Sequence, residues 1–124
     1  MANLLANFVS KLDSGGTTGA AFTIPGATPN PDAVAIDGGG NAWVTDEGDS
    51  TLVELNNAGT VLSGTTGYPP VNGDDPDAVA VDGSGDVWYT SQSSNIVYEV
   101  IGAAVPVVTP IAYAVANGIL GTQP

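Results

Sequence analysis

A segment of 26 residues occurs twice in this chain, and the two copies lie 45 positions apart. Pro31–Asn56 aligns without a gap with Pro76–Ile101, and 11 of the 26 aligned residues are identical. The best-matched stretch reads Pro-Asp-Ala-Val-Ala-Ile-Asp in the first copy and Pro-Asp-Ala-Val-Ala-Val-Asp in the second. Repetition at a fixed period of roughly 20–50 residues is typical of folds built from stacked units. The repeat therefore constrains the fold more than any other feature of the sequence.

Each copy of the repeat predicts a series of short antiparallel strands. Compact apolar runs alternate with turns rich in Gly, Asn and Asp, residues that supply positive φ or bond to their own turn. In the first copy the expected strands cover residues 32–37, 42–45, 51–55 and 60–63, and in the second copy the third strand covers 95–101. Four short strands in about 40–45 residues are typical of a β-propeller blade. We therefore predict an all-β fold, with Trp43 and Trp88 packed between adjacent blades.

The matched residues also resemble a known family. The pattern Pro-x-x-Val-Ala-hydrophobic-Asp-x-x-Gly-Asn/Asp-hydrophobic-Trp-hydrophobic-Thr resembles the NHL repeat and the related streptogramin (virginiamycin B) lyase-like repeat. The stretches Leu52–Tyr68 and Ile101–Pro110 resemble the inter-blade and closing segments of bacterial propellers of this kind. The resemblance covers residues 31–110 and implies the fold. It implies much less about activity, because propellers host many unrelated functions.

The chain offers too few blades for a closed ring. We expect one domain over 1–124, in which residues 1–30 form a partial blade or latch strands, 31–75 form a blade, and 76–124 form a blade plus a closing segment. That gives a partial β-propeller of about 2.5–3 four-stranded blades, whereas closed propellers have roughly four to eight. Either several copies complete one ring by homo-oligomerisation, with a dimer favoured over a trimer, or the chain is a natural, excised or designed piece of a longer one.

Composition excludes several functions. Thirteen carboxylates against the single Lys11 give a net charge of −12, which disfavours binding to nucleic acid and to anionic membranes. Cys and His are absent, so thiol chemistry, thiolate zinc sites and histidine general bases are excluded. The apolar stretch 100–124 is interrupted by Pro106 and Pro110, which argues against a membrane span. The acidic, cysteine-free composition fits a secreted or bacterial cell-envelope protein, although residues 1–12 do not resemble a signal peptide.

These constraints favour a non-catalytic scaffold or binding module that assembles into a ring and binds a protein or glycan. The alternative is a streptogramin-lyase-like or hydrolase propeller with a divalent metal in its channel, although the sequence lacks the histidine that the lyase resemblance implies. The candidate ligand-binding residues are Trp43, Asp46, Glu47, Asp49, Trp88 and Tyr89. The candidate metal ligands, for Ca²⁺ or Mg²⁺, are Asp74, Asp75 and Asp77, which also fit a solvated loop. Asp37 and Asp82 resemble the start of a calcium loop, but they lack its acidic twelfth residue, and a carboxylate that bonds its own turn explains them better.

Overall fold

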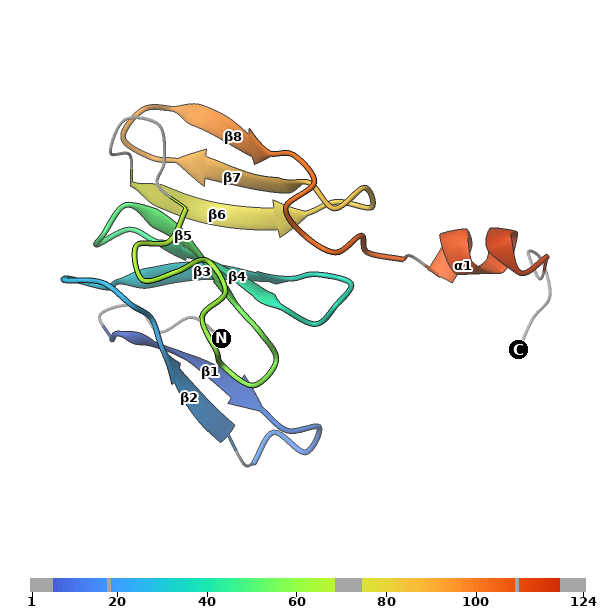
Figure 1. Cartoon of the computed structure of the whole chain (residues 1–124), viewed down its shortest axis with the longest axis horizontal. Coiled ribbons are helices and arrows are strands. Elements are labelled where there is room, and N and C mark those ends of the chain that lie inside the picture. The colour runs from blue at the N-terminus through green and yellow to red at the C-terminus, as the bar shows by residue number, and fades with distance from the viewer. Residues whose placement is uncertain (1–5, 18, 69–74, 109, 119–124) are drawn as a thin grey trace.

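A computed structural model describes residues 6–17, 19–68, 75–108 and 110–118 of the chain. Within these residues the fold consists of three small antiparallel sheets and one short helix, with the sheets arranged in succession along the chain (Figure 1). The strands are β1 (Phe8–Leu12), β2 (Gly19–Thr23), β3 (Pro31–Ile36), β4 (Ala42–Asp46), β5 (Thr51–Leu55), β6 (Pro76–Val81), β7 (Val87–Ser91) and β8 (Ile96–Val100). The helix is α1 (Pro110–Ala116). The prediction of an all-β partial propeller is confirmed.

The two copies of the repeat form two sheets with the same topology and the same register. Strands β3, β4 and β5 pair in that order, as do β6, β7 and β8, while β1 and β2 form a separate two-stranded hairpin. In the first sheet Ala35 lies opposite Trp43, and in the second sheet Ala80 lies opposite Trp88. The 45-residue offset of the sequence is therefore an offset of one blade in space.

A carboxylate at the end of the first strand builds the turn that follows it. Asp37 Oδ1 accepts the backbone N–H groups of Gly39 (2.8 Å) and Asn41 (2.9 Å), and its Oδ2 accepts the indole N–H of Trp43 (3.3 Å). Asp82 makes the same three bonds in the second copy. Both carboxylates hydrogen-bond to their own turn and to the Trp that lies six residues later in the sequence. The structure therefore supports the turn interpretation of these residues over a calcium loop.

The core consists of two clusters, one at each junction between successive sheets. At the first junction Val9 and Ile24 pack against the buried aliphatic side chains of β4 and β5. At the second, Trp43 and Leu52 pack against Val87 and Tyr89. The first repeat sheet thus packs on the hairpin with one face and on the second repeat sheet with the other, and a sheet buries both faces only when it has a neighbour on each side. Trp43 thus packs between adjacent blades, as predicted.

Two segments differ from the expectation. Residues 60–63 form only an isolated bridge, Leu55 to Val61, so each of the two repeat sheets has three regular strands and the predicted strand at 60–63 is wrong. The chain from 110 to 116 is helical, although the composition favoured strands. Proline is well tolerated in the first turn of a helix, where its missing N–H costs nothing, and Gly118, with φ 66°, lies just beyond the helix end. Among the described residues no helix has the length and apolarity needed to span a membrane.

After β8 the chain crosses from the second sheet to the first instead of turning back along β8. The N–H of Ala104 donates to the carbonyl of Gly85 (2.9 Å), and the N–H of Gly38 donates to the carbonyl of Val105 (2.9 Å). The N–H of Val105 also donates to Asp37 Oδ2 (3.1 Å). Residues 102–106 therefore form a strap that ties the Asp37 and Asp82 turns together.

Candidate functional site

The most acidic part of the described chain is the edge where β3 and β6 begin and where β4 and β7 end. We call this edge the acidic rim. Its acidic residues are Asp32, Asp46, Glu47, Asp49, Asp75 and Asp77. It lies at the opposite end of the strands from the strap, and it holds a pocket at each junction between successive units.

The pocket at the second junction is lined by carboxylates. Asp32 and Asp77 occupy the same position in the two repeats, and the innermost strands β3 and β6 pack side by side, so the two side chains meet. Thr45 fixes this approach, since its hydroxyl donates to the carbonyl of Asp77 (2.9 Å). Glu47 and Asp75 also line the cavity, which has a volume of about 210 Å³.

The side chains of Asp32 and Asp77 are hydrogen-bonded to each other. A hydrogen bond between their side chains, followed by burial and the negative charges of Asp77 and Glu47, raises the pKa of Asp32 from 3.8 to about 6. Two carboxyl groups in contact cannot both ionise easily, so one of them stays protonated in mildly acidic solution. Below about pH 6 the rim therefore holds Asp32 as a carboxylic acid in contact with Asp77, and such an acid can donate a proton.

Asp46 and Glu47 position the loop that enters the first repeat. Asp46 is fully buried, and its Oδ1 accepts the backbone N–H of Asn30 (2.6 Å). Burial raises the pKa of Asp46, and the bond from Asn30 only partly offsets this effect. The Asn30 side chain donates to Glu47 Oε2 (2.9 Å). These two acidic residues thus hold the loop before β3 in place, and Glu47 alone of the two lines the carboxylate pocket.

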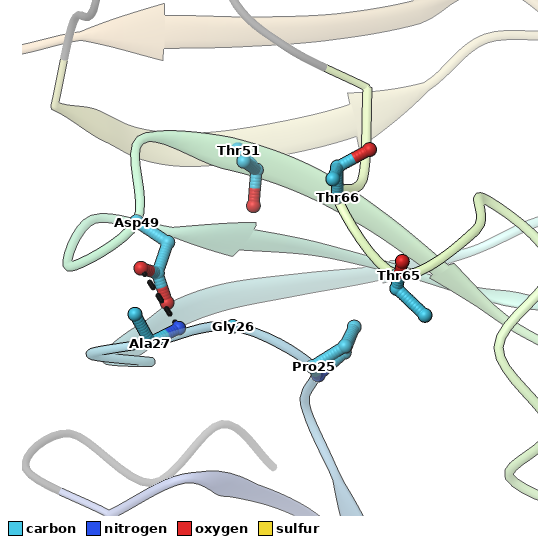
Figure 2. A pocket seen from close by; sticks show the side chains of 7 residues that line it. All are labelled: Pro25, Gly26, Ala27, Asp49, Thr51, Thr65 and Thr66. Atoms are coloured by element: carbon cyan, nitrogen blue, oxygen red, sulfur yellow. Dashed lines mark hydrogen bonds between the residues drawn. The ribbon is translucent and has the colours of Figure 1, made fainter.

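The pocket at the first junction is larger and is lined by hydroxyl groups. It has a volume of about 600 Å³, and Figure 2 shows Asp49 and Ala27 on one side with Thr65 and Thr66 on the other. Asp49 accepts the backbone N–H groups of Ala27 and Thr28 (both 3.1 Å), so its carboxylate is held rigidly. A fixed carboxylate facing threonine hydroxyls offers both acceptors and donors to a hydroxyl-rich ligand.

The predicted ligand-binding residues do not form one site. Glu47 and Asp49 line the two rim pockets. Trp43 and Asp46 are fully buried and Tyr89 is nearly so, because these side chains pack inside the fold rather than face solvent. Trp88 is 38 % exposed, but it lies on the free face of the second sheet and not on the rim.

The predicted metal ligands are only partly described. Asp74 lies outside the described residues. Asp75 and Asp77 both line the carboxylate pocket, where Asp77 bonds to Asp32. Among the described residues no group of three acidic side chains is arranged to hold a metal ion.

Sequence reasoning missed Asp32 and the three threonines of the larger pocket. The signal for Asp32 was present, because Asp follows Pro at the start of both repeats and the inner strands of neighbouring blades are adjacent. Thr51, Thr65 and Thr66 come from separate segments and carry no repeat signal, so only the folded chain brings them together.

Comparison with solved structures supports the fold. A streptogramin B lyase superimposes with a TM-score of 0.68 at 20 % identity over 88 % of this chain and 36 % of the lyase. Virginiamycin B lyase from Staphylococcus aureus gives 0.60 at 17 %, covering 77 % of this chain and 34 % of the lyase. A putative gluconolactonase gives 0.57 at 24 %, covering 87 % and 37 %. No protein-family model and no curated protein sequence matches the chain.

The chain spans about a third of the length of these solved propellers. This proportion agrees with the small number of sheets in the described fold. The resemblance to lyase-like propellers is thus confirmed at the level of the fold, and the chain has the architecture of part of a β-propeller.

Proposed function

We propose that this chain is a non-catalytic propeller scaffold that completes its ring with further copies of itself and binds a hydroxyl-rich ligand, such as a glycan, along the acidic rim. The observation that carries the proposal is the pair of rim pockets, one at each junction between successive units. A ring of several copies repeats these pockets around its circumference. Repeated weak sites on one rigid assembly bind a repetitive ligand with high avidity.

The larger pocket supports a glycan more than a flat protein surface. It is concave, and Thr51, Thr65 and Asp49 provide hydroxyl and carboxylate groups around it. The net charge of −12 disfavours acidic glycans, so the ligand class is a neutral or cationic one. A protein partner is the other outcome that a binding screen would reveal.

Two measurements test this function. The solution mass by sedimentation equilibrium should correspond to two chains, or to three as the next alternative, and a mass of one chain at all concentrations would contradict ring assembly. A screen of neutral and amino-bearing glycans should give binding that is lost in Thr51→Val, which removes a hydroxyl from the pocket. Thr60→Val, outside both pockets, is the matched control and should bind normally.

A second candidate is a hydrolase or lyase-like propeller enzyme with a divalent metal in its channel. The raised pKa of Asp32 and its hydrogen bond to Asp77 favour this candidate, because a carboxyl group with a raised pKa can act as a general acid. Against the lyase reaction stands the lack of histidine, since the solved virginiamycin B lyases include a catalytically inactive histidine-to-alanine variant with quinupristin. Turnover of quinupristin or gluconolactone that requires Mg²⁺ or Ca²⁺ and is lost in Asp32→Asn would establish this candidate. Rates equal to the buffer blank would eliminate it.

A further inference from the structure

The two repeat sheets present matching residues on the same face, but only one of these faces is covered. In the first sheet Trp43 and Leu52 are 0 % and 1 % exposed, because the second sheet packs on them and Tyr68 stacks on Trp43 (5.5 Å between ring centroids) and pairs with Leu52. Their equivalents in the second sheet, Trp88 and Val97, are 38 % and 60 % exposed. The uncovered face thus carries the residues of an inter-blade contact without the blade that covers them.

The hydrogen bonds of two equivalent threonines, Thr45 and Thr90, differ in the same way. The Thr45 hydroxyl accepts the N–H of Ala33 (3.0 Å) within its own sheet and donates to the carbonyl of Asp77 (2.9 Å) in the next one. Thr90 accepts the N–H of Ala78 (3.1 Å) in the equivalent way. In the described part of the chain no neighbouring sheet provides an acceptor for the Thr90 hydroxyl.

The opposite end of the molecule has the complementary surface. Val81 on β6 packs against the cluster that contains Trp43 and Leu52. Its equivalent in the first sheet, Ile36 on β3, is 59 % exposed. Ile36 and Val34 line one wall of an apolar groove of about 390 Å³, and Val9, Leu12 and Phe22 of the β1–β2 hairpin line the other, so the hairpin covers this face of the first sheet only in part.

We propose that a second copy of this chain packs head to tail on the free face of β6–β8. Trp88 and Val97 of one copy then contact the Ile36 groove of the next, as Trp43 and Leu52 belong to the cluster on which Val81 packs within one chain. The inference rests on the proposed self-assembly and names its interface. A second copy is the expected partner because each exposed surface has an equivalent 45 residues away in the sequence. Those equivalent surfaces already contact each other between the two repeat sheets of one chain.

This contact is heterologous, so each added copy leaves one free surface of each kind until a ring closes. Charge opposes it, because every copy carries −12. Within the first sheet Asn41 donates to Glu54 (3.1 Å), whereas Asp86 stands at the Asn41 position of the second sheet and has no side-chain N–H to donate to Glu99. The second sheet therefore carries an extra carboxylate at this position, and salt should strengthen assembly by screening the negative charge.

The test uses the full chain with one carboxylate placed in each half of the contact. Val97→Glu and Ile36→Glu should each raise the dissociation constant of the assembly at least about tenfold, as expected for a charge in the centre of an interface. Ile101→Glu is the matched control, because Ile101 is 79 % exposed and lies outside both surfaces. Its assembly should equal that of the unsubstituted chain.

Mixing the two variants then tests the head-to-tail geometry. Val97→Glu retains an intact Ile36 groove and Ile36→Glu retains an intact β6–β8 face, so an equimolar mixture should recover a two-chain mass that neither variant has alone. Recovery also shows that both variants are folded. A mixture that stays at the mass of one chain overturns the head-to-tail contact.

Two further outcomes separate this inference from the function on which it rests. If the unsubstituted chain assembles and Val97→Glu assembles equally well, the proposed interface is wrong while self-assembly stands. If the unsubstituted chain has the mass of one chain at every protein and salt concentration, both proposals fail.

Discussion

The sheets β3–β5 and β6–β8 have nearly the same sequence pattern and the same register, yet they differ in burial. Trp43 and Trp88 donate to the Asp six residues earlier at 3.3 and 3.1 Å, and each lies opposite an Ala in its sheet. Only Trp43 is covered by a following sheet. The local structure of a blade is therefore set by its own residues, whereas the burial of its core depends on a neighbour.

The comparison shows why an isolated blade is not a stable unit. Stacked repeats gain most of their stability from the contacts between units, and each unit alone leaves an apolar face in water. The first sheet has a neighbour on both faces, although the hairpin covers one of them only in part. The second sheet has a neighbour on one face, so it should be the less stable of the two.

The largest expected effect separates the two tryptophans. In dilute solution, Trp43→Ala should lower the free energy of unfolding by about 3–5 kcal/mol, because it empties a buried site. Trp88→Ala should cost only about 1 kcal/mol, since its side chain is already partly in water. Both substitutions remove the same bond to Asp, so the difference reports burial alone. Equal losses in urea denaturation would contradict the comparison.

A smaller effect is expected where the strap crosses the turns. A Cβ on Gly38 would clash with the carbonyl oxygen of Pro106, whereas a Cβ on Gly83, its equivalent, would lie 3.8 Å from the nearest atom, the carbonyl oxygen of Val107. We therefore expect Gly38→Ala to cost about 1–3 kcal/mol and Gly83→Ala to be nearly neutral. Thermal unfolding of both variants measures the difference. A neutral Gly38→Ala would show that the strap does not bind the first sheet.

The smallest effect concerns the Asp32–Asp77 pair, which joins the starts of the two repeats. The folded pKa of Asp32, about 6, lies above 3.8, so folding takes up a proton between these values. The contribution of the pair to the free energy of unfolding is fully present below about pH 4 and is lost as the pH rises through 6. Solvent screening limits it to the order of 1 kcal/mol. Asp32→Asn, which cannot titrate, should remove this part of the pH dependence. If the profile of stability against pH is unchanged from pH 4 to 7 in this variant, the raised pKa of Asp32 is refuted.

The repeat predicted the strands well because its signal is local. The apolar runs and the Gly-rich turns place β3, β4, β5 and β8 within about a residue of their bounds. The prediction of a strand at 60–63 failed because Gly64 and Gly67, both at positive φ, interrupt the pairing with β5, which resumes only at the bridge between Tyr68 and Leu52. The helix at 110–116 was missed because Pro110 was taken as a helix breaker, although it stands at the first position of the helix.

The candidate site was harder to predict because it depends on contacts between units. The sequence predicts that Asp46 and Tyr89 are exposed on a rim. Both are buried, because Asp46 accepts the backbone N–H of Asn30 and Tyr89 packs against the first sheet. Asp32 and Asp77 are 45 positions apart, and nothing in either repeat alone indicates that their side chains form a hydrogen bond. Only the stacking of one blade on the next brings them together.

The most direct test of the account is the solvent accessibility of the two tryptophans as the chain assembles. Protein labelled with 5-fluorotryptophan gives one ¹⁹F resonance for each, and the effect of a soluble paramagnetic agent on each resonance reports its exposure. In dilute solution Trp43 should be protected and Trp88 exposed, and Trp88 should become protected as the concentration rises through the assembly transition. A Trp88 that stays equally exposed in the assembled protein would contradict the claim that this face is one half of an inter-blade contact.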